Sequence, residues 1–230
     1  MKHLTTEWQV GDGREEAAAV YVAANARRGD LDDVIATIDD FARNRSMLIN
    51  VGDEKGEILD TAIRAVKPSF VMELGTYVGY GALRLARSAP EARIVSVEFL
   101  PANAAIARRN IEHAGLSDRV TVVDGSIGDG GRTIEHLRTV IGLGPGQLDA
   151  VFLDHAKEHY LADLHTIEDS GFLHPGSVVI ADNVGFPGAP DYRAYMTEQE
   201  GKRYRTTEHA THVEYQSLIK DLVLESAYLG

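Results

Sequence analysis

Two apolar runs in the second half of the chain end in oxygen-bearing side chains. The run at 149–153 is followed by Asp154, and the run at 178–181 is followed by Asp182 and Asn183. Each run has the length and β-branched content of a buried strand. If the two are neighbouring parallel strands, their ends lie roughly 4.8 Å apart. Two carboxylates and an amide oxygen are then predicted to converge on one small cation, for which Mg²⁺ is the natural candidate.

The local spacing around these ligands allows two interpretations. Asp182 and Asn183 can face one site only if the strand has ended and the chain is turning, because adjacent strand residues point to opposite faces. Alternatively, Asp154 caps the following helix and the Asp182–Asn183 pair forms an Asx-turn. Lys157 follows Asp154 by three residues, a spacing that puts both on one side of a helix that has already begun. An isolated surface lysine is the alternative.

A glycine-rich segment at 73–81 lies where an apolar strand is expected to turn into a helix. Its glycines permit close approach of a ligand to the backbone, and a helix N-terminus offers unpaired N–H groups. Three residues separate Gly75 from Gly79, whereas the dinucleotide fingerprint separates its first two glycines by one. Glu98 ends the next predicted strand, where an acid can accept hydrogen bonds from ribose hydroxyls. Adenosine binding is the favoured interpretation, and a purely structural tight turn is the other.

The segment from Glu73 to Gly79 resembles the E-x-G-x-x-x-G loop of class I S-adenosylmethionine-dependent methyltransferases. The resemblance implies that Glu98 holds the ribose and Phe99 lies against the adenine. It implies further cofactor contacts, which are Gly75, Tyr77 and Gly81 at the methionine portion, Ser126 and Ile127 near the adenine, and Val51, Glu73, Asp154 and His155 elsewhere in the pocket.

Four further segments, at 50–56, 154–160, 181–191 and 213–215, are similar to segments of catechol O-methyltransferase, in the same order. The similarity runs from about Ala24 to the C-terminus. It implies transfer of a methyl group from S-adenosylmethionine to one hydroxyl of a catechol. Mg²⁺ would be held by Asp154, Asp182 and Asn183, with Lys157 as the base. Substrate contacts would come from Lys157, Asn183, Pro187 and Glu214, of which Glu214 would bind the hydroxyl that is not methylated.

Three positions depart from the animal members of that family. Ala156 stands where those proteins have a tryptophan, aliphatic Leu48 lies in a loop that carries an aromatic residue there, and Gly81 replaces a serine. We expect the smaller side chains of Ala156 and Leu48 to leave a thinner wall around the substrate. Such a pocket should admit bulkier catechols and weaken control over whether the meta or the para hydroxyl is methylated.

The elements that must position these residues follow from periodicity. Helices are predicted at 14–28, 31–45, 54–66, 80–87, 101–114 and 158–169, and strands at 69–74, 93–98, 119–123, 149–153, 177–181, 204–208 and 217–228. Alternating strands and helices favour a Rossmann-like three-layer α/β sandwich. Its seven-stranded sheet would be mostly parallel, with an antiparallel C-terminal edge pair. We expect one domain over 1–230, with extra N-terminal helices at about 14–66 and the sheet core at about 69–230.

Composition excludes several classes of protein. The 230 residues carry a formal net charge of −12, which disfavours nucleic-acid binding, and the absence of cysteine excludes thiolate chemistry. The histidines at 155, 159 and 165 lack the spacing of a zinc site. No signal peptide or membrane-spanning run is apparent, so a cytoplasmic enzyme with a small-molecule substrate and no membrane partner is expected. The pattern leaves the oligomeric state open.

Other interpretations remain at this point. The substrate could be another vicinal diphenol of a caffeoyl or natural-product type. A cofactor-binding protein without turnover and a nicotinamide dehydrogenase are the alternatives from other classes. Trp8, Tyr192 and Tyr195 are aromatic residues that could line a pocket, although helix-spaced aromatics usually belong to a core.

Overall fold

The computed structural model describes residues 11–230, so Trp8 lies outside the described part. The strands are β1 (Phe70–Leu74), β2 (Arg93–Glu98), β3 (Val120–Asp124), β4 (Leu148–Leu153), β5 (Leu173–Ala181), β6 (Tyr204–His212) and β7 (Lys220–Tyr228). The α-helices are α1 (Arg14–Asn25), α2 (Leu31–Asn44), α3 (Gly52–Val66), α4 (Tyr80–Ser88), α5 (Pro101–His113), α6 (Arg132–His136), α7 (Tyr160–Asp169) and α8 (Pro190–Glu198). Short non-α turns are η1 (Leu137–Ile141), η2 (Lys157–His159) and η3 (Val184–Gly188).

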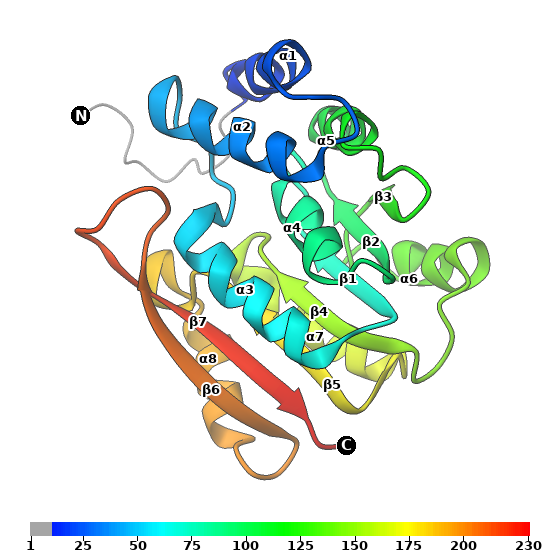
Figure 1. Ribbon diagram of the computed structural model, residues 1–230. Helices are drawn as coiled ribbons and strands as arrows, with labels where there is room; N and C mark the ends of the chain where they lie inside the picture. The colour runs from blue at the N-terminus through cyan, green and yellow to red at the C-terminus, as the bar shows by residue number, and fades with distance from the viewer. Residues whose placement is uncertain (1–10) are drawn as a thin grey trace.

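The described strands form one seven-stranded sheet in the order β3-β2-β1-β4-β5-β7-β6 (Figure 1). Strands β1 to β5 pair in parallel, and β7 is antiparallel to both of its neighbours, β5 and β6. The order reverses between β1 and β4, which is where open α/β sheets place their ligands. The predicted Rossmann-like sandwich with an antiparallel C-terminal edge is confirmed.

Helices cover both faces of the sheet, and the strand residues alternate between them (Figure 1). Val71 packs with the cluster that contains α1 to α5, whereas Met72 packs with the cluster that contains α6, α7 and α8. Because successive side chains point to opposite faces that are both covered, β1 is expected to be apolar along its length. All five of its residues are buried, and four are apolar; the exception in character is Glu73, which is 1% exposed. A buried carboxyl group inside an otherwise apolar strand is costly unless it is hydrogen-bonded.

Some elements differ from the sequence-based prediction. Helices α6 and α8 were not expected, although Pro190 occupies the first turn of α8, where proline is favoured. Strand β6 extends to His212 rather than stopping near 208, because its exposed polar residues are held by backbone pairing with β7 and carry no apolar signal. The helix expected from 158 begins at Tyr160 as α7, after the 3-10 turn at Lys157–His159.

Within residues 11–230, no helix combines the length and the apolar character required to cross a lipid bilayer.

Candidate active site

The two predicted ligand-bearing strands are neighbours. Leu153 of β4 pairs with Ala181 of β5 in parallel register, and the N–H of Asp182 donates to the carbonyl of Leu153 at 3.0 Å. The register therefore brings Asp154 and Asp182, the residues that directly follow this pair, to the same edge of the sheet. The prediction that these strands lie side by side is confirmed.

Gly75 lies at the same edge, next to Asp154. It directly follows β1, with a φ of +95°, and a Cβ built on it would lie 2.4 Å from the carbonyl oxygen of Asp154. A side chain has no room between the ends of β1 and β4, and L-residues avoid this backbone conformation. Glycine is thus required here by the packing of the two strand ends.

The predicted cation ligands are buried. The side chain of Asp182 is fully buried and that of Asp154 is 12% exposed. Asn183 has a φ of +54°, so the chain has left the strand and both residues of the pair can face one site, as the first of the two interpretations required. The backbone N–H of Asn183 donates to Asp182 Oδ1 at 2.8 Å.

The electrostatics of this acidic edge favour a positive charge. Burial raises the pKa of Asp182 to about 7, and burial likewise raises the pKa of Asp154. The charge of Asp154 contributes to the raised pKa of Asp182, and that of Glu214 contributes to both, since like charges repel at short range. The side-chain amide of Asn183 donates through Nδ2 to Glu214 at 3.0 Å and to Asp221 at 2.9 Å. The Oδ1 atom of Asn183 is therefore the side-chain atom that can coordinate a cation.

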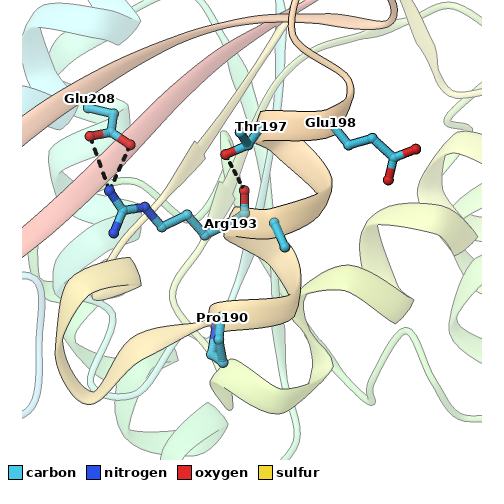
Figure 2. A pocket seen from close by; sticks show the side chains of 6 residues that line it. Pro190, Arg193, Thr197, Glu198 and Glu208 are labelled. Atoms are coloured by element: carbon cyan, nitrogen blue, oxygen red, sulfur yellow. Dashed lines mark hydrogen bonds and ion pairs between the residues drawn. The ribbon is translucent and has the colours of Figure 1, made fainter.

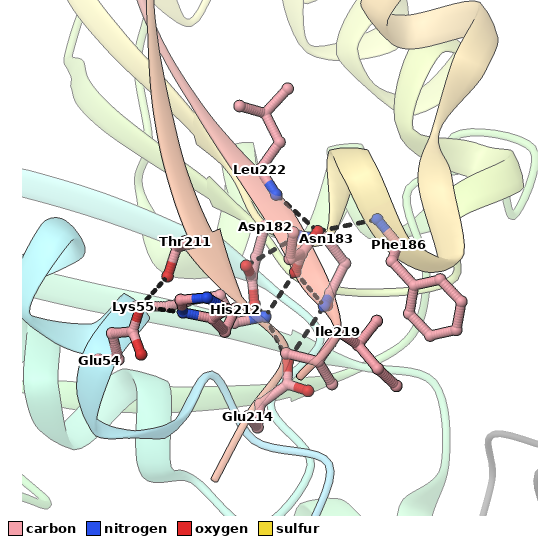
Figure 3. Close-up of polar contacts among 12 residues, drawn as sticks. Glu54, Lys55, Asp182, Asn183, Phe186, Thr211, His212, Glu214, Ile219 and Leu222 are labelled. Atoms are coloured by element: carbon pink, nitrogen blue, oxygen red, sulfur yellow. Dashed lines mark hydrogen bonds and ion pairs between the residues drawn. The ribbon is translucent and has the colours of Figure 1, made fainter. Parts of the chain in front are cut away.

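One group within residues 11–230 already carries positive charge here, and the sequence analysis did not single it out. The ammonium of Lys55, on the first turn of α3, is 2.8 Å from Asp182 Oδ2 and 3.1 Å from Asp221 Oδ2, and it also contacts Glu214 (Figure 3). Burial lowers the pKa of Lys55, but the three carboxylates outweigh burial and raise it above the usual range. Lys55 is therefore a protonated, 1% exposed cation within the site.

Lys157 points into the same region. Its Nζ donates to Asp154 Oδ1 at 3.1 Å and to the Tyr160 hydroxyl at 2.8 Å. Tyr160 is fully buried, and its hydroxyl lies 2.8 Å from the carbonyl of Leu153 and 3.1 Å from that of Asp182. Burial raises the pKa of Tyr160 well above its usual range, so this hydroxyl stays neutral. Tyr160 orients Lys157 and was also missed, because a buried helix tyrosine looks like ordinary core.

Glu98 occupies the predicted ribose position at the end of β2. Its carboxylate is 6% exposed and accepts hydrogen bonds from the backbone N–H groups of Thr76 at 3.1 Å, Tyr77 at 2.9 Å and Leu100 at 2.8 Å. Burial raises its pKa, while these three donors lower it. Glu98 therefore fixes the glycine-rich loop, and a carboxylate with about four acceptor positions keeps one for a ligand.

Glu73 and Gly81 are in direct contact. Glu73 accepts a short hydrogen bond from the Ser96 hydroxyl, and burial raises the pKa of Glu73 well above its usual range. A Cβ on Gly81 would lie 2.1 Å from Glu73 Oε1. The glycine therefore leaves room for the carboxyl group, and a serine at this position would displace it.

The remaining predicted cofactor residues differ in exposure. Phe99 is 67% exposed directly after Glu98, so its ring offers an open apolar face. Val51 and Ile127 are buried, and Ser126 is half-buried. His155 lies 3.0 Å from Asp163 through Nε2 and packs on the Tyr160 ring, and burial lowers its pKa.

The predicted substrate wall is only partly as expected. Ala156 and Pro187 are exposed beside the site, with a cis peptide bond between Phe186 and Pro187. Leu48, in contrast, is 1% exposed and belongs to the core cluster on the α3 side. Its neighbour Met47 is 55% exposed, so the open position of that loop is one residue earlier than we expected.

No three His, Asp or Glu side chains within residues 11–230 are arranged as a metal-binding group. The predicted set does not depend on one, since it consists of two carboxylates and an amide oxygen. A separate surface hollow of about 800 Å³ lies between α8 and β6 (Figure 2). It is crossed by the Arg193–Glu208 ion pair at 3.0 Å, in which both side chains are about half exposed, and it includes none of the predicted cation, cofactor or substrate residues.

Comparison with known proteins places this geometry in a family. The sequence profile described as O-methyltransferase matches residues 31–208. The chain belongs to the O-methyltransferase family. A probable O-methyltransferase of Mycobacterium tuberculosis is 61% identical over 230 residues, which cover all of this chain and 98% of that protein. Catechol O-methyltransferase B of Danio rerio is 43% identical over 210 residues, 91% of this chain and 76% of that protein.

Solved structures agree with the family fold. The O-methyltransferase TomG of Streptomyces achromogenes, solved in complex with S-adenosylmethionine, has a TM-score of 0.69 at 22% identity and covers 96% of this chain and all of that one. The chain described here is thus an enzyme, an O-methyltransferase with a Rossmann-like sheet. The resemblance to catechol O-methyltransferases found in its sequence is confirmed.

Proposed function

We propose that this O-methyltransferase transfers a methyl group from S-adenosylmethionine to one hydroxyl of a catechol, with Mg²⁺ bound at the acidic edge. The observation that carries the proposal is the convergence of Asp154, Asp182 and Asn183 with Lys157 and Glu214 at one end of the sheet. Methyl transfer alone requires no such set, whereas a cation, a base and an acceptor at one place suit the two adjacent hydroxyls of a vicinal diphenol.

The methyl donor would lie over the glycine-rich loop. Glu98 would accept from the ribose hydroxyls, the exposed ring of Phe99 would stack on the adenine, and Gly75 and Tyr77 would border the methionine portion. When bound, S-adenosylmethionine supplies the methyl group, whose bond to sulfur breaks as the bond to the substrate oxygen forms. The protein contributes by holding both reactants in line, which is a large part of catalysis in two-substrate reactions.

The acidic edge fits a divalent cation. Asp154 and Asp182 are carboxylates whose burial makes unneutralised charge costly, and Asn183 keeps its amide oxygen available because its N–H groups are committed to Glu214 and Asp221. Bound Mg²⁺ would supply charge that lowers the pKa of a phenol from about 10. Lys55 supplies only one positive charge against three carboxylates.

Lys157 would accept the proton from the hydroxyl that is methylated. Tyr160 fixes the direction of Nζ through a hydroxyl that itself stays neutral. The side chain of Glu214 is 11% exposed in the β6–β7 turn, and it would accept from the second hydroxyl. The methyl group would pass directly to the deprotonated hydroxyl oxygen, so no covalent enzyme intermediate would be required.

A substrate panel tests this proposal. Purified protein with S-adenosylmethionine and Mg²⁺ is incubated with catechol, a caffeoyl-type diphenol, guaiacol and phenol, and products are identified by mass spectrometry. We expect monomethylated products from the two diphenols and at least 100-fold lower rates with guaiacol and phenol, which lack the second hydroxyl. Equal rates with the monophenols would contradict the role given to Glu214 and the cation site.

Activity with the caffeoyl-type diphenol alone would support the proposed methyl transfer but would replace catechol as the proposed substrate. Binding of S-adenosylmethionine without any product would favour a cofactor-binding protein, although such a protein would have no use for Lys157.

A further inference from the structure

Lys55 and Asp221 form a buried pair of opposite charges. Lys55 contacts Asp182 and Glu214, and Asp221 accepts from Asn183, so the pair lies next to the predicted substrate and cation contacts; Lys55 is labelled in Figure 3. The two residues come from α3 and from the start of β7, and their charged atoms are 3.1 Å apart. Neither is among the groups that would touch a reactant. Burial of a charged pair is costly, and a pair of apolar residues can often replace it without loss of stability. Its contacts with the site therefore require an explanation beyond folding.

Asp221 is anchored on one side and binds the site on the other. Its Oδ1 accepts from the backbone N–H groups of Phe186 at 2.8 Å and Leu222 at 2.7 Å. Its Oδ2 accepts from Asn183 Nδ2 at 2.9 Å and from Lys55. One carboxylate thus ties the amide of Asn183 and the turn that carries Pro187 to the sheet.

Lys55 connects the same carboxylate to Glu214. Its ammonium contacts Glu214 and Asp182 as well as Asp221, so it bridges the end of β5, the start of β7 and the turn between β6 and β7. The first turn of α3 also packs on Glu214, since a Cβ on Gly52 would lie 3.4 Å from the Glu214 Cβ. Asn183 Nδ2 shares both acceptors, Glu214 and Asp221, with Lys55.

We propose that Lys55 and Asp221 are positioning residues that hold Glu214 and Asn183 in one orientation and so decide which hydroxyl of a diphenol is methylated. This inference rests on the proposed function. Glu214 would select the hydroxyl that stays free, and Asn183 would orient the cation, so movement of either changes which oxygen faces the methyl group. Residues behind metal ligands typically affect affinity or activity by about 10–100-fold when replaced.

Two substitutions separate positioning from simple electrostatics. Lys55→Met removes a positive charge from the site and Asp221→Asn removes a negative one, so effects of charge alone on cation binding have opposite signs. Loss of orientation, in contrast, should move the isomer ratio in the same direction in both variants. Asp221→Asn keeps an oxygen acceptor for the N–H groups of Phe186 and Leu222 and serves as the variant that folds if Lys55→Met does not. Lys202→Met, at an exposed lysine, is the control.

The experiment measures the ratio of the two monomethylated isomers of several 4-substituted catechols, using the full chain with S-adenosylmethionine and Mg²⁺. Hydrogen exchange of residues 184–188 and 213–219 is measured on the protein alone. We expect both variants to move the isomer ratio at least threefold toward 1:1 and to speed exchange in both segments, while Lys202→Met matches the wild type.

Three results overturn the inference. They are an unchanged ratio and unchanged exchange in folded variants, ratio shifts of opposite sign in the two variants, and a wild-type ratio of 1:1 with every catechol. Absence of methylation by the wild type would instead overturn the proposed function, and the exchange measurement would still report whether Lys55 and Asp221 hold the two segments.

Discussion

Replacement of Gly75 by alanine tests the strand-end packing on which the site depends. Gly75 has a φ of +95°, a conformation that costs an L-residue about 1–2 kcal/mol. Its added Cβ would also lie 2.4 Å from the carbonyl oxygen of Asp154 and 2.9 Å from the nitrogen of His155, both backbone atoms that cannot rotate away. Overpacking of this kind costs about 1–3 kcal/mol more.

Gly171→Ala is the matched control. Gly171 has a φ of +73°, and nothing lies within 4 Å of its added Cβ, so only the backbone conformation is penalised there. In both variants, alanine lowers the conformational entropy of the unfolded chain, which offsets about 0.4–1 kcal/mol of the destabilisation. Gly75→Ala should therefore be about 1–3 kcal/mol less stable than Gly171→Ala. For a chain of this size that difference corresponds to a Tm lower by about 2–12 °C.

Urea and thermal unfolding, followed by circular dichroism, measure this difference, and methyl transfer is assayed on the folded proteins. Gly75→Ala should also lose activity, because Asp154 can accommodate the methyl group only by moving the strand end that carries it. Equal stability of Gly75→Ala and Gly171→Ala would refute the argument that the close approach of β1 and β4 requires glycine.

Three further outcomes are expected. Lys157→Ala should lower kcat by about 10²–10⁴-fold with little change in binding of S-adenosylmethionine by calorimetry, and a wild-type rate would remove Lys157 from its role as base. Arg84→Met should cost about 1.5–3 kcal/mol in urea unfolding because the buried carboxylate of Asp60 loses its hydrogen bonds to Arg84, 2.8 Å away, while Arg87 and Arg64 still contact it, and a loss below about 0.5 kcal/mol would disprove this. The pKa of His174 is raised by the carbonyl of Pro175 and by Asp149, so stability from its protonated form is present below about pH 6.5 and disappears as pH rises through the raised value. His174→Gln should accordingly be less stable than the wild type at pH 5.5 and equal to it at pH 9. A difference in the free energy of unfolding that grows as pH rises would contradict the raised pKa of His174.

Much of the fold was predictable from local patterns. The apolar runs that became β1, β2 and β4 are continuous because both faces are covered, and their abrupt polar ends marked the edge where Asp154 and Asp182 meet. The parallel pairing of β4 with β5 also followed from alternating strands and helices. By contrast, β6 was predicted too short because its exposed positions carry no apolar signal.

The parts of the site that escaped sequence analysis depend on long-range burial. Lys55 meets Glu214 and Asp221 across more than 150 residues of chain, and nothing in the first turn of a helix distinguishes a buried lysine from a solvated one. Tyr160 resembled a core aromatic, and Leu48 was assigned to the wall although its side chain points into the core. Such assignments need the packing of distant elements.

The measurement that tests the central claim most directly is a metal titration of methyl transfer to catechol. Protein stripped with chelator is assayed with S-adenosylmethionine and catechol while Mg²⁺ is added back, alongside an Asp182→Ala variant treated in the same way. The account predicts no monomethylated product without the cation, full restoration by Mg²⁺ in the wild type, and no restoration in the variant at the same concentrations. Undiminished methylation in chelator, or equal restoration of Asp182→Ala, would contradict it.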